Sequence, residues 1–124
     1  MDLIKKEIQS FGHAFRGIAM LFKEEGHARI HAIAVACIVG LGFWLGLDAW
    51  EWCAILMCMG LVISLEAVNT AVERLADRVS KEKHPLLKDA KDVAAGAVLI
   101  AVLFAAVIWS IIFIPKILDF FLSE

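Results

Sequence analysis

The sequence lacks the features that mark several common protein classes. Its formal net charge is only −2 over 124 residues, so it has neither the basic surface of a nucleic-acid-binding protein nor an acidic tail. Its three cysteines, Cys37, Cys53 and Cys58, lie in apolar runs without a C-x-x-C pair. We therefore expect no nucleic-acid partner, no disulfide framework and no cysteine-based metal site.

Glycine motifs that bind phosphate groups are also missing. The sequence contains no G-x-x-x-x-G-K-[ST] segment and no dinucleotide-binding glycine fingerprint. A nucleotide would therefore have to bind by another route. The N-terminal region has no short apolar core followed by a small-residue cleavage site, so we expect the first apolar span itself to direct membrane insertion.

Apolar residues dominate what is present. The chain is 61% hydrophobic, with a mean hydropathy of +0.80, which is too apolar for a small soluble domain. Its length fits one domain, residues 1–124. Pro85 is expected to break the second apolar helix, and Pro115 to close the third. We predict an all-α membrane protein with three transmembrane helices at about residues 30–47, 50–79 and 93–114.

Residues 1–25 form a different kind of segment. Ile4, Ile8, Phe11 and Phe15 recur at three- and four-residue steps, while most charged residues lie elsewhere on the helical wheel. This pattern predicts an amphipathic helix in the membrane interface. The alternative is an ordinary surface helix on a soluble core, but the chain has little soluble core for it to cover.

Lysine and arginine residues are distributed unevenly about the predicted spans. They precede the first span and fill the connection between the second and third, whereas the first connection has none and only Lys116 follows the third span. By the positive-inside rule, the N-terminus and the second connection are cytoplasmic.

A polar stripe continues the second apolar span. Glu66, Asn69, Glu73 and Asp77 fall on one helix face at about 100° per residue. An ionisable residue inside a span is expensive unless it has a partner, so Glu66 indicates a functional site. Its depth suits a general base for an alcohol presented from the lipid phase. The alternative is that these charges pair with one another to satisfy a helix bundle.

Further groups near the same membrane face could handle a phosphorylated ligand. Glu25 and Glu73 could together bind magnesium, which prefers one or two carboxylates plus substrate phosphates. Lys91 could reach phosphate oxygens as a point charge. His27 and His31 are four residues apart but make a poor zinc motif without a third ligand.

Three segments resemble the small bacterial integral-membrane lipid kinases, the diacylglycerol kinase and undecaprenol kinase family. They are EAVNTAVE at residues 66–73, HPL at 84–86 and AKDVAAGAV at 90–98. The resemblance extends from Phe11 to about Lys116. It implies a homotrimer in the bacterial inner (cytoplasmic) membrane, with sites between neighbouring subunits. It also implies Mg²⁺- and ATP-dependent phosphorylation of a lipid alcohol.

The resemblance also assigns roles by position. Glu66 matches the general base, and Glu25 and Glu73 match the carboxylates that hold the metal. Arg29, Glu66 and Asn69 are expected to contact the lipid substrate. The residues expected to bind the nucleotide come from several parts of the chain: Glu25, Glu73, Asp77, Glu82, His84, Lys91 and Asp92.

The acceptor is the point on which branches of this family differ. The Arg29-Ile30-His31 and His84-Pro85-Leu86 segments resemble the undecaprenol kinase branch more than the diacylglycerol kinase branch. His13 replaces an aromatic residue expected near the nucleotide. We therefore expect undecaprenol as acceptor, with diacylglycerol as the alternative. A second alternative is a helical membrane oligomer without catalysis, in which Glu66 would line a pore.

Overall fold

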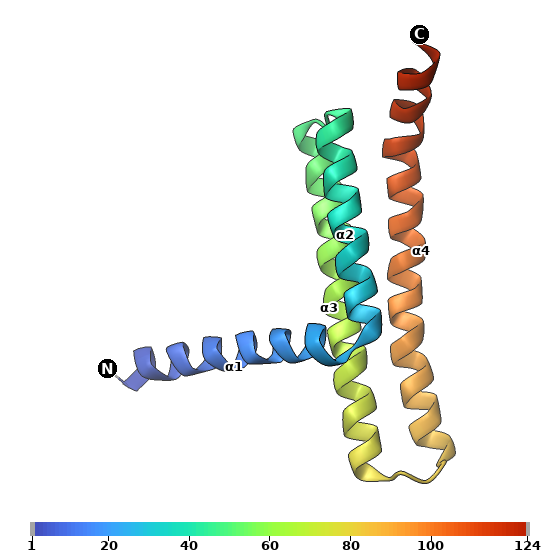
Figure 1. The fold of residues 1–124 in the computed structure, drawn as a ribbon. Coiled ribbons are helices and arrows are strands. Elements are labelled where there is room, and N and C mark those ends of the chain that lie inside the picture. Colours follow the sequence, from blue (N-terminus) through green and yellow to red (C-terminus); the bar gives the residue numbers. More distant parts are fainter. Residues whose placement is uncertain (1, 124) are drawn as a thin grey trace.

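The computed structural model describes residues 2–123, and every regular element among them is an α-helix. Three helices, α2, α3 and α4, stand side by side, whereas α1 runs crosswise and joins the lower end of α2 (Figure 1). Each of the three is long and apolar enough to cross a membrane. These findings confirm the predicted all-α chain with three candidate spans. The bounds are α1 (Asp2–Glu24), α2 (Gly26–Leu45), α3 (Ala49–Val79) and α4 (Pro85–Leu122).

The connection between α2 and α3 is short and well specified by its residues. Gly46 takes a left-handed conformation with φ of 72°, which costs glycine little, and its N–H donates to the carbonyl of Gly42. Asp48 then caps α3 by accepting from the Glu51 N–H at 2.9 Å, while the Glu51 carboxylate accepts from the Asp48 N–H at 3.1 Å. This reciprocal pair is a capping box, and it sets the start of α3.

Proline has opposite effects at its two positions. Pro85 begins α4, and His84 caps that helix by accepting from the Leu86 N–H at 3.2 Å, so the expected break after α3 is confirmed. The expectation that Pro115 closes the last helix is wrong, because α4 continues to Leu122. A proline inside a helix removes one hydrogen bond, a loss that packing on the neighbouring helix can offset. Lys116 provides such a contact with α3, through an ion pair with Glu51 at 3.0 Å.

The buried core lies mainly between α3 and α4, whose interface is the most extensive of any helix pair. One cluster contains Cys58, Val62, Ala101 and Ala105, and the small alanines let the two backbones approach closely. A second cluster, nearer the top of the bundle, contains Ile55, Met59 and Phe113, with α2 residues packed against it. The three cysteines are free thiols.

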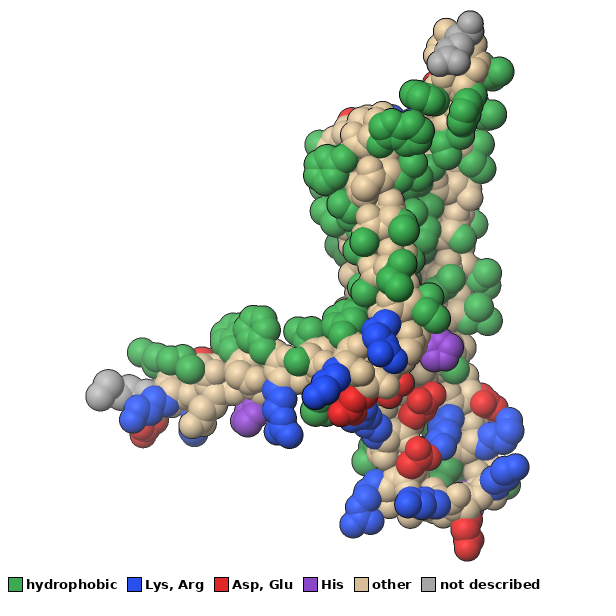
Figure 2. All heavy atoms as spheres, in the orientation of Figure 1, with side chains coloured by type: hydrophobic (Ala, Val, Ile, Leu, Met, Phe, Trp, Pro, Cys, Tyr) green, Lys and Arg blue, Asp and Glu red, His purple; other side chains and the backbone are tan. Residues whose placement is uncertain are grey.

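Apolar side chains also cover much of the outer surface. Large residues such as Phe43, Leu103 and Ile111 are more than half exposed, as expected of side chains that face lipid or a neighbouring chain. Along α1, hydrophobic side chains gather on one side and most lysines and arginines on the other (Figure 2). The placement of α1 in the membrane interface stays a prediction.

Gly42 offers a direct test of the packing between α2 and α3. A methyl group at this position would lie 2.8 Å from a Trp52 ring carbon and 2.9 Å from Leu47 Cδ1. The Trp52 ring has little freedom to move, since it also packs against Phe43 at 4.9 Å between centroids. We expect Gly42→Ala to lower the free energy of unfolding by about 1–2 kcal/mol.

The matched control is Gly40→Ala on the same helix, where nothing lies within 4 Å of the added methyl group. Unfolding midpoints in detergent micelles compare the two variants. Equal midpoints would contradict the packing described here.

Candidate functional site

Charged side chains are concentrated at one end of the helix bundle. Figure 2 shows lysines, arginines and carboxylates around the lower ends of α3 and α4, below the level of α1, while hydrophobic side chains cover the part above. The polar stripe of α3 crosses this boundary, because Glu66 and Asn69 are buried whereas Asp77 is exposed. One continuous helix therefore carries carboxylates both in the apolar part of the bundle and at its charged end.

Glu66 lines a cavity of about 300 Å³ between the three upright helices. Glu66 is only 6% exposed, so its carboxylate is largely shielded from solvent. α2 and α3 contribute polar groups to the wall, whereas α4 contributes only apolar ones. The lining residues are His27, His31, Glu66, Asn69, Glu73, Ala95, Val98, Leu99 and Val102.

Two contacts organise the polar wall of this cavity. His31 Nε2 lies 3.6 Å from Glu66 Oε2, and the Asn69 amide donates to Glu73 Oε1 at 3.4 Å. Asn69 is 9% exposed, and its Oδ1 atom has no hydrogen-bond partner among the described residues. A buried acceptor without a donor is costly, so this oxygen is suited to bind an O–H or N–H group brought by a ligand.

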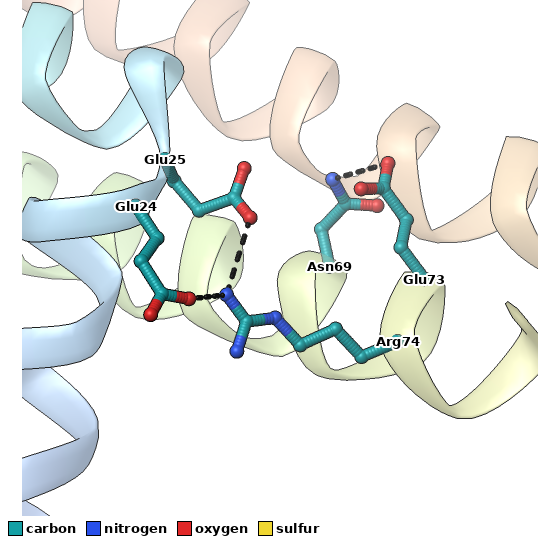
Figure 3. A network of polar contacts seen from close by, with 5 residues as sticks. All are labelled: Glu24, Glu25, Asn69, Glu73 and Arg74. Atoms are coloured by element: carbon teal, nitrogen blue, oxygen red, sulfur yellow. Dashed lines mark hydrogen bonds and ion pairs between the residues drawn. The ribbon is translucent and has the colours of Figure 1, made fainter. Parts of the chain in front are cut away.

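A second polar network ties the α1–α2 junction to α3 (Figure 3). The Arg74 guanidinium lies 2.6 Å from the Glu24 carboxylate and 3.6 Å from that of Glu25. Figure 3 shows the Glu25 carboxylate directed toward the part of α3 that carries Asn69 and Glu73. Arg74 thereby holds one of the two proposed metal-binding carboxylates beside the helix that carries the other.

A separate cavity of about 250 Å³ lies at the connection between α3 and α4. Of the residues expected to bind nucleotide, it brings together Glu82, His84 and Lys91, beside further lysines. Lys91 also pairs with Asp77 and so links α4 to α3. Asp92 lies outside this lining and pairs with Lys88 at 2.6 Å.

Six of the expected site residues thus fall into two groups within one chain. Glu66, Asn69 and Glu73 line the cavity between the three upright helices, while Glu82, His84 and Lys91 line the cavity at the connection. Arg29 is exposed at the start of α2 and lines neither.

The predicted magnesium ligands are two carboxylates, those of Glu25 and Glu73. Among the described residues, no group of three or more His, Cys, Asp or Glu side chains is placed to hold a metal ion. Glu25 and Glu73 nevertheless supply hard oxygen ligands, and Mg²⁺ usually completes its shell with water and substrate phosphates.

Two features of the site were missed from the sequence. The contact of Arg74 with Glu24 and Glu25 was not expected, because Arg74 and Glu24 are 50 residues apart in the sequence and opposite charge is the only signal that links them. His31 was considered as a possible zinc ligand with His27 and as part of a segment that resembles the undecaprenol kinase branch, but its contact with Glu66 was not expected. The four-residue spacing of the histidines says nothing about which residues of another helix they face.

Comparison with known proteins adds an independent line of evidence. Residues 12–113 match the family described as prokaryotic diacylglycerol kinase. An undecaprenol kinase of Bacillus subtilis (strain 168) is 38% identical over 113 residues, which are 91% of this chain and 92% of that protein. A diacylglycerol kinase of Escherichia coli (strain K12) is 32% identical over 105 residues, covering 85% and 86%. One from Haemophilus influenzae (strain ATCC 51907 / DSM 11121 / KW20 / Rd) is 35% identical over 103 residues, covering 82% and 86%.

Arg74→Gln tests whether this arginine fixes the position of the α1–α2 junction. Removing the guanidinium leaves Glu24 and Glu25 without a cation, so α1 should move more freely relative to α3. Spin labels at Ser10 and Ser64, introduced after replacement of the native cysteines and diluted with unlabelled protein, report this distance. We expect a broader distance distribution with little change in thermal stability, because exposed ion pairs stabilise folding weakly.

Arg78→Gln is the control, since Arg78 lies one turn further along α3 and takes part in none of the ion pairs found among residues 2–123. An unchanged distribution in Arg74→Gln would show that other contacts fix the junction.

Proposed function

The chain belongs to the prokaryotic diacylglycerol kinase family, and we propose that it is an ATP-dependent lipid kinase whose acceptor is undecaprenol. The observation that carries this proposal is the buried carboxylate of Glu66 in a cavity with one polar and one apolar wall. A lipid alcohol combines a hydroxyl group with an apolar chain, and it needs both kinds of wall. The family match disfavours the alternative of a membrane oligomer without catalysis.

Glu66 acts as the general base in the proposed reaction. Its carboxylate takes the proton of the lipid hydroxyl, the hydroxyl oxygen bonds to the γ-phosphorus of ATP, and the bond to the β-phosphate oxygen breaks to release ADP. Phosphoryl transfer requires mainly positioning and charge stabilisation from the protein. Asn69 contributes positioning, because its amide donates to Glu73 Oε1. Its unpartnered Oδ1 can accept from another O–H or N–H group of the bound ligands, since the proton of the lipid hydroxyl goes to Glu66.

The carboxylates of Glu25 and Glu73 are proposed to hold Mg²⁺, which when bound offsets negative charge on the phosphates. Glu82, His84 and Lys91 are proposed to bind the nucleotide, since they share the cavity at the α3–α4 connection. Asp77 and Asp92 support this region through their pairs with Lys91 and Lys88. Arg29, which is exposed at the start of α2, is proposed to contact the polar end of the lipid.

The chain is a multi-pass membrane protein, and we place it in the bacterial inner membrane. The N-terminus and the α3–α4 connection then face the cytoplasm, where ATP is found. The distribution of lysine and arginine supports this orientation, as does the charged end of the bundle below α1 (Figure 2). In this placement α1 lies in the interface with its apolar side toward the lipid.

The active form is proposed to be a homotrimer with sites between subunits. Within one chain, the cavity of Glu66 and the cavity of Lys91 have no lining residue in common. A neighbouring subunit would bring the nucleotide-binding residues of one chain to the base of another. The exposed apolar side chains of the spans offer surface for such an assembly.

Undecaprenol is preferred over diacylglycerol on two grounds. The Bacillus subtilis undecaprenol kinase is 38% identical to this chain, whereas the Escherichia coli diacylglycerol kinase is 32% identical over a somewhat shorter match. The Arg29-Ile30-His31 segment also resembles the undecaprenol kinase branch, and the structure places His31 beside Glu66.

A competition assay tests this choice. Purified protein in mixed micelles receives labelled ATP with Mg²⁺ and equal amounts of undecaprenol and a diacylglycerol, and the labelled lipids are then separated. We expect preferential transfer to undecaprenol, because the Arg29-Ile30-His31 segment resembles that branch and its His31 lies beside Glu66.

Micelles without protein provide the blank. Preferential labelling of diacylglycerol would overturn the acceptor while leaving the kinase reaction intact. No label in either lipid, from protein shown to be folded, would overturn the proposed kinase function.

A further inference from the structure

His31 has a side chain that can take up a proton, and the proposed reaction does not yet give it a role. We propose that His31 positions Glu66 and receives from it the proton taken from the lipid hydroxyl. This inference rests on the proposed lipid kinase function and deepens it. The sequence presents His31 as half of an incomplete zinc motif and as part of a segment that resembles one branch of the family, whereas the structure pairs its Nε2 atom with Glu66 Oε2 at 3.6 Å.

The burial of the two side chains supports this order of proton transfer. The Glu66 side chain is 7% exposed and that of His31 is 23% exposed. Within residues 2–123, His31 is the only basic side chain found within ion-pair distance of Glu66. A proton on the more enclosed carboxylate therefore meets His31 on its way toward solvent. A shortening of a few tenths of an ångström would bring the two atoms to hydrogen-bond length.

The surroundings leave this role to His31. α4 faces the cavity with Ala95, Val98, Leu99 and Val102, none of which can exchange a proton. The other titratable groups that line the cavity are His27, on α2, and Glu73, on α3. Glu73 accepts from the Asn69 amide. The charged residues at the start of α4, Lys91 and Asp92, pair with Asp77 and Lys88 and lie outside the cavity lining.

The hydroxyl proton is carried by two groups in turn, Glu66 and then His31. Before reaction, Glu66 is ionised and His31 is neutral. The hydroxyl proton moves to Glu66 as the oxygen bonds to the γ-phosphorus and ADP leaves. The proton then passes from Glu66 to His31 Nε2, and His31 releases it to solvent, which restores the ionised carboxylate and the neutral imidazole for the next turnover. When His31 is already protonated this acceptor is lost, so activity should fall as the pH is lowered.

The test compares His31→Gln with the wild-type protein in the lipid phosphorylation assay over a range of pH. Glutamine keeps much of the size and polarity of histidine but cannot take up a proton. We expect kcat to fall by about 10- to 100-fold, within the range for proton-transfer groups. We also expect KM for ATP to change little, and the part of the acid loss of activity that depends on the His31 imidazole to disappear.

His27→Gln serves as the matched control, because His27 lies one turn away on α2 and lines the same cavity without pairing with Glu66. It should keep the acid limb of the wild-type pH profile. A second readout does not depend on activity. In nitrogen-15 spectra of the histidine rings, Glu66→Gln should shift the His31 signals more than those of His27, so a His31 variant that fails to fold does not prevent the test.

The outcomes separate this inference from the function on which it rests. Wild-type protein that phosphorylates no lipid overturns the proposed function. Active wild-type protein, together with a His31→Gln variant of unchanged kcat and pH profile, overturns the role of His31 alone. Nitrogen-15 signals of the His31 ring that do not change in Glu66→Gln would also overturn the role of His31.

Discussion

The burial of one carboxylate in an apolar helix is the constraint on which this structure depends. Withdrawing an ionised group from water costs several kcal/mol unless partners offset the loss. Glu66 is 6% exposed and has the His31 ring at 3.6 Å as its partner. Such an arrangement is poor for stability alone, because an apolar residue of similar volume would avoid the cost. It becomes intelligible when the cavity around Glu66 receives a ligand that carries a hydroxyl group.

The rest of the fold joins that apolar site to a charged end. α3 runs without a break from Glu66 to Asp77, about 16 Å along the helix axis. Arg74 holds the α1–α2 junction against this helix, and Lys91 joins it to α4 beside the α3–α4 connection. The protein can therefore meet a lipid at one level and a phosphorylated, water-soluble ligand at another. A kinase that joins a membrane alcohol to ATP needs this division.

Much of this architecture follows from the sequence because it depends on local signals. Apolar run length predicts three spans, and the Pro85 region predicts the break before α4; both are confirmed. The 3.6-residue period also predicts that Glu66 and Asn69 share a face, and they line one cavity. Pro115 misleads because its effect depends on packing of the following turn against α3. The pairing of His31 with Glu66 could not be predicted, since it depends on the rotation of two helices relative to each other.

Glu66→Gln shows directly whether Glu66 takes the proton of the lipid hydroxyl. The amide keeps the shape of the side chain but cannot act as a base. The measurement is kcat for lipid phosphorylation, with ATP binding and thermal stability recorded on the same sample. We expect a loss of at least about 100-fold in kcat, with ATP affinity and folding retained. Wild-type kcat in pure Glu66→Gln protein would contradict it.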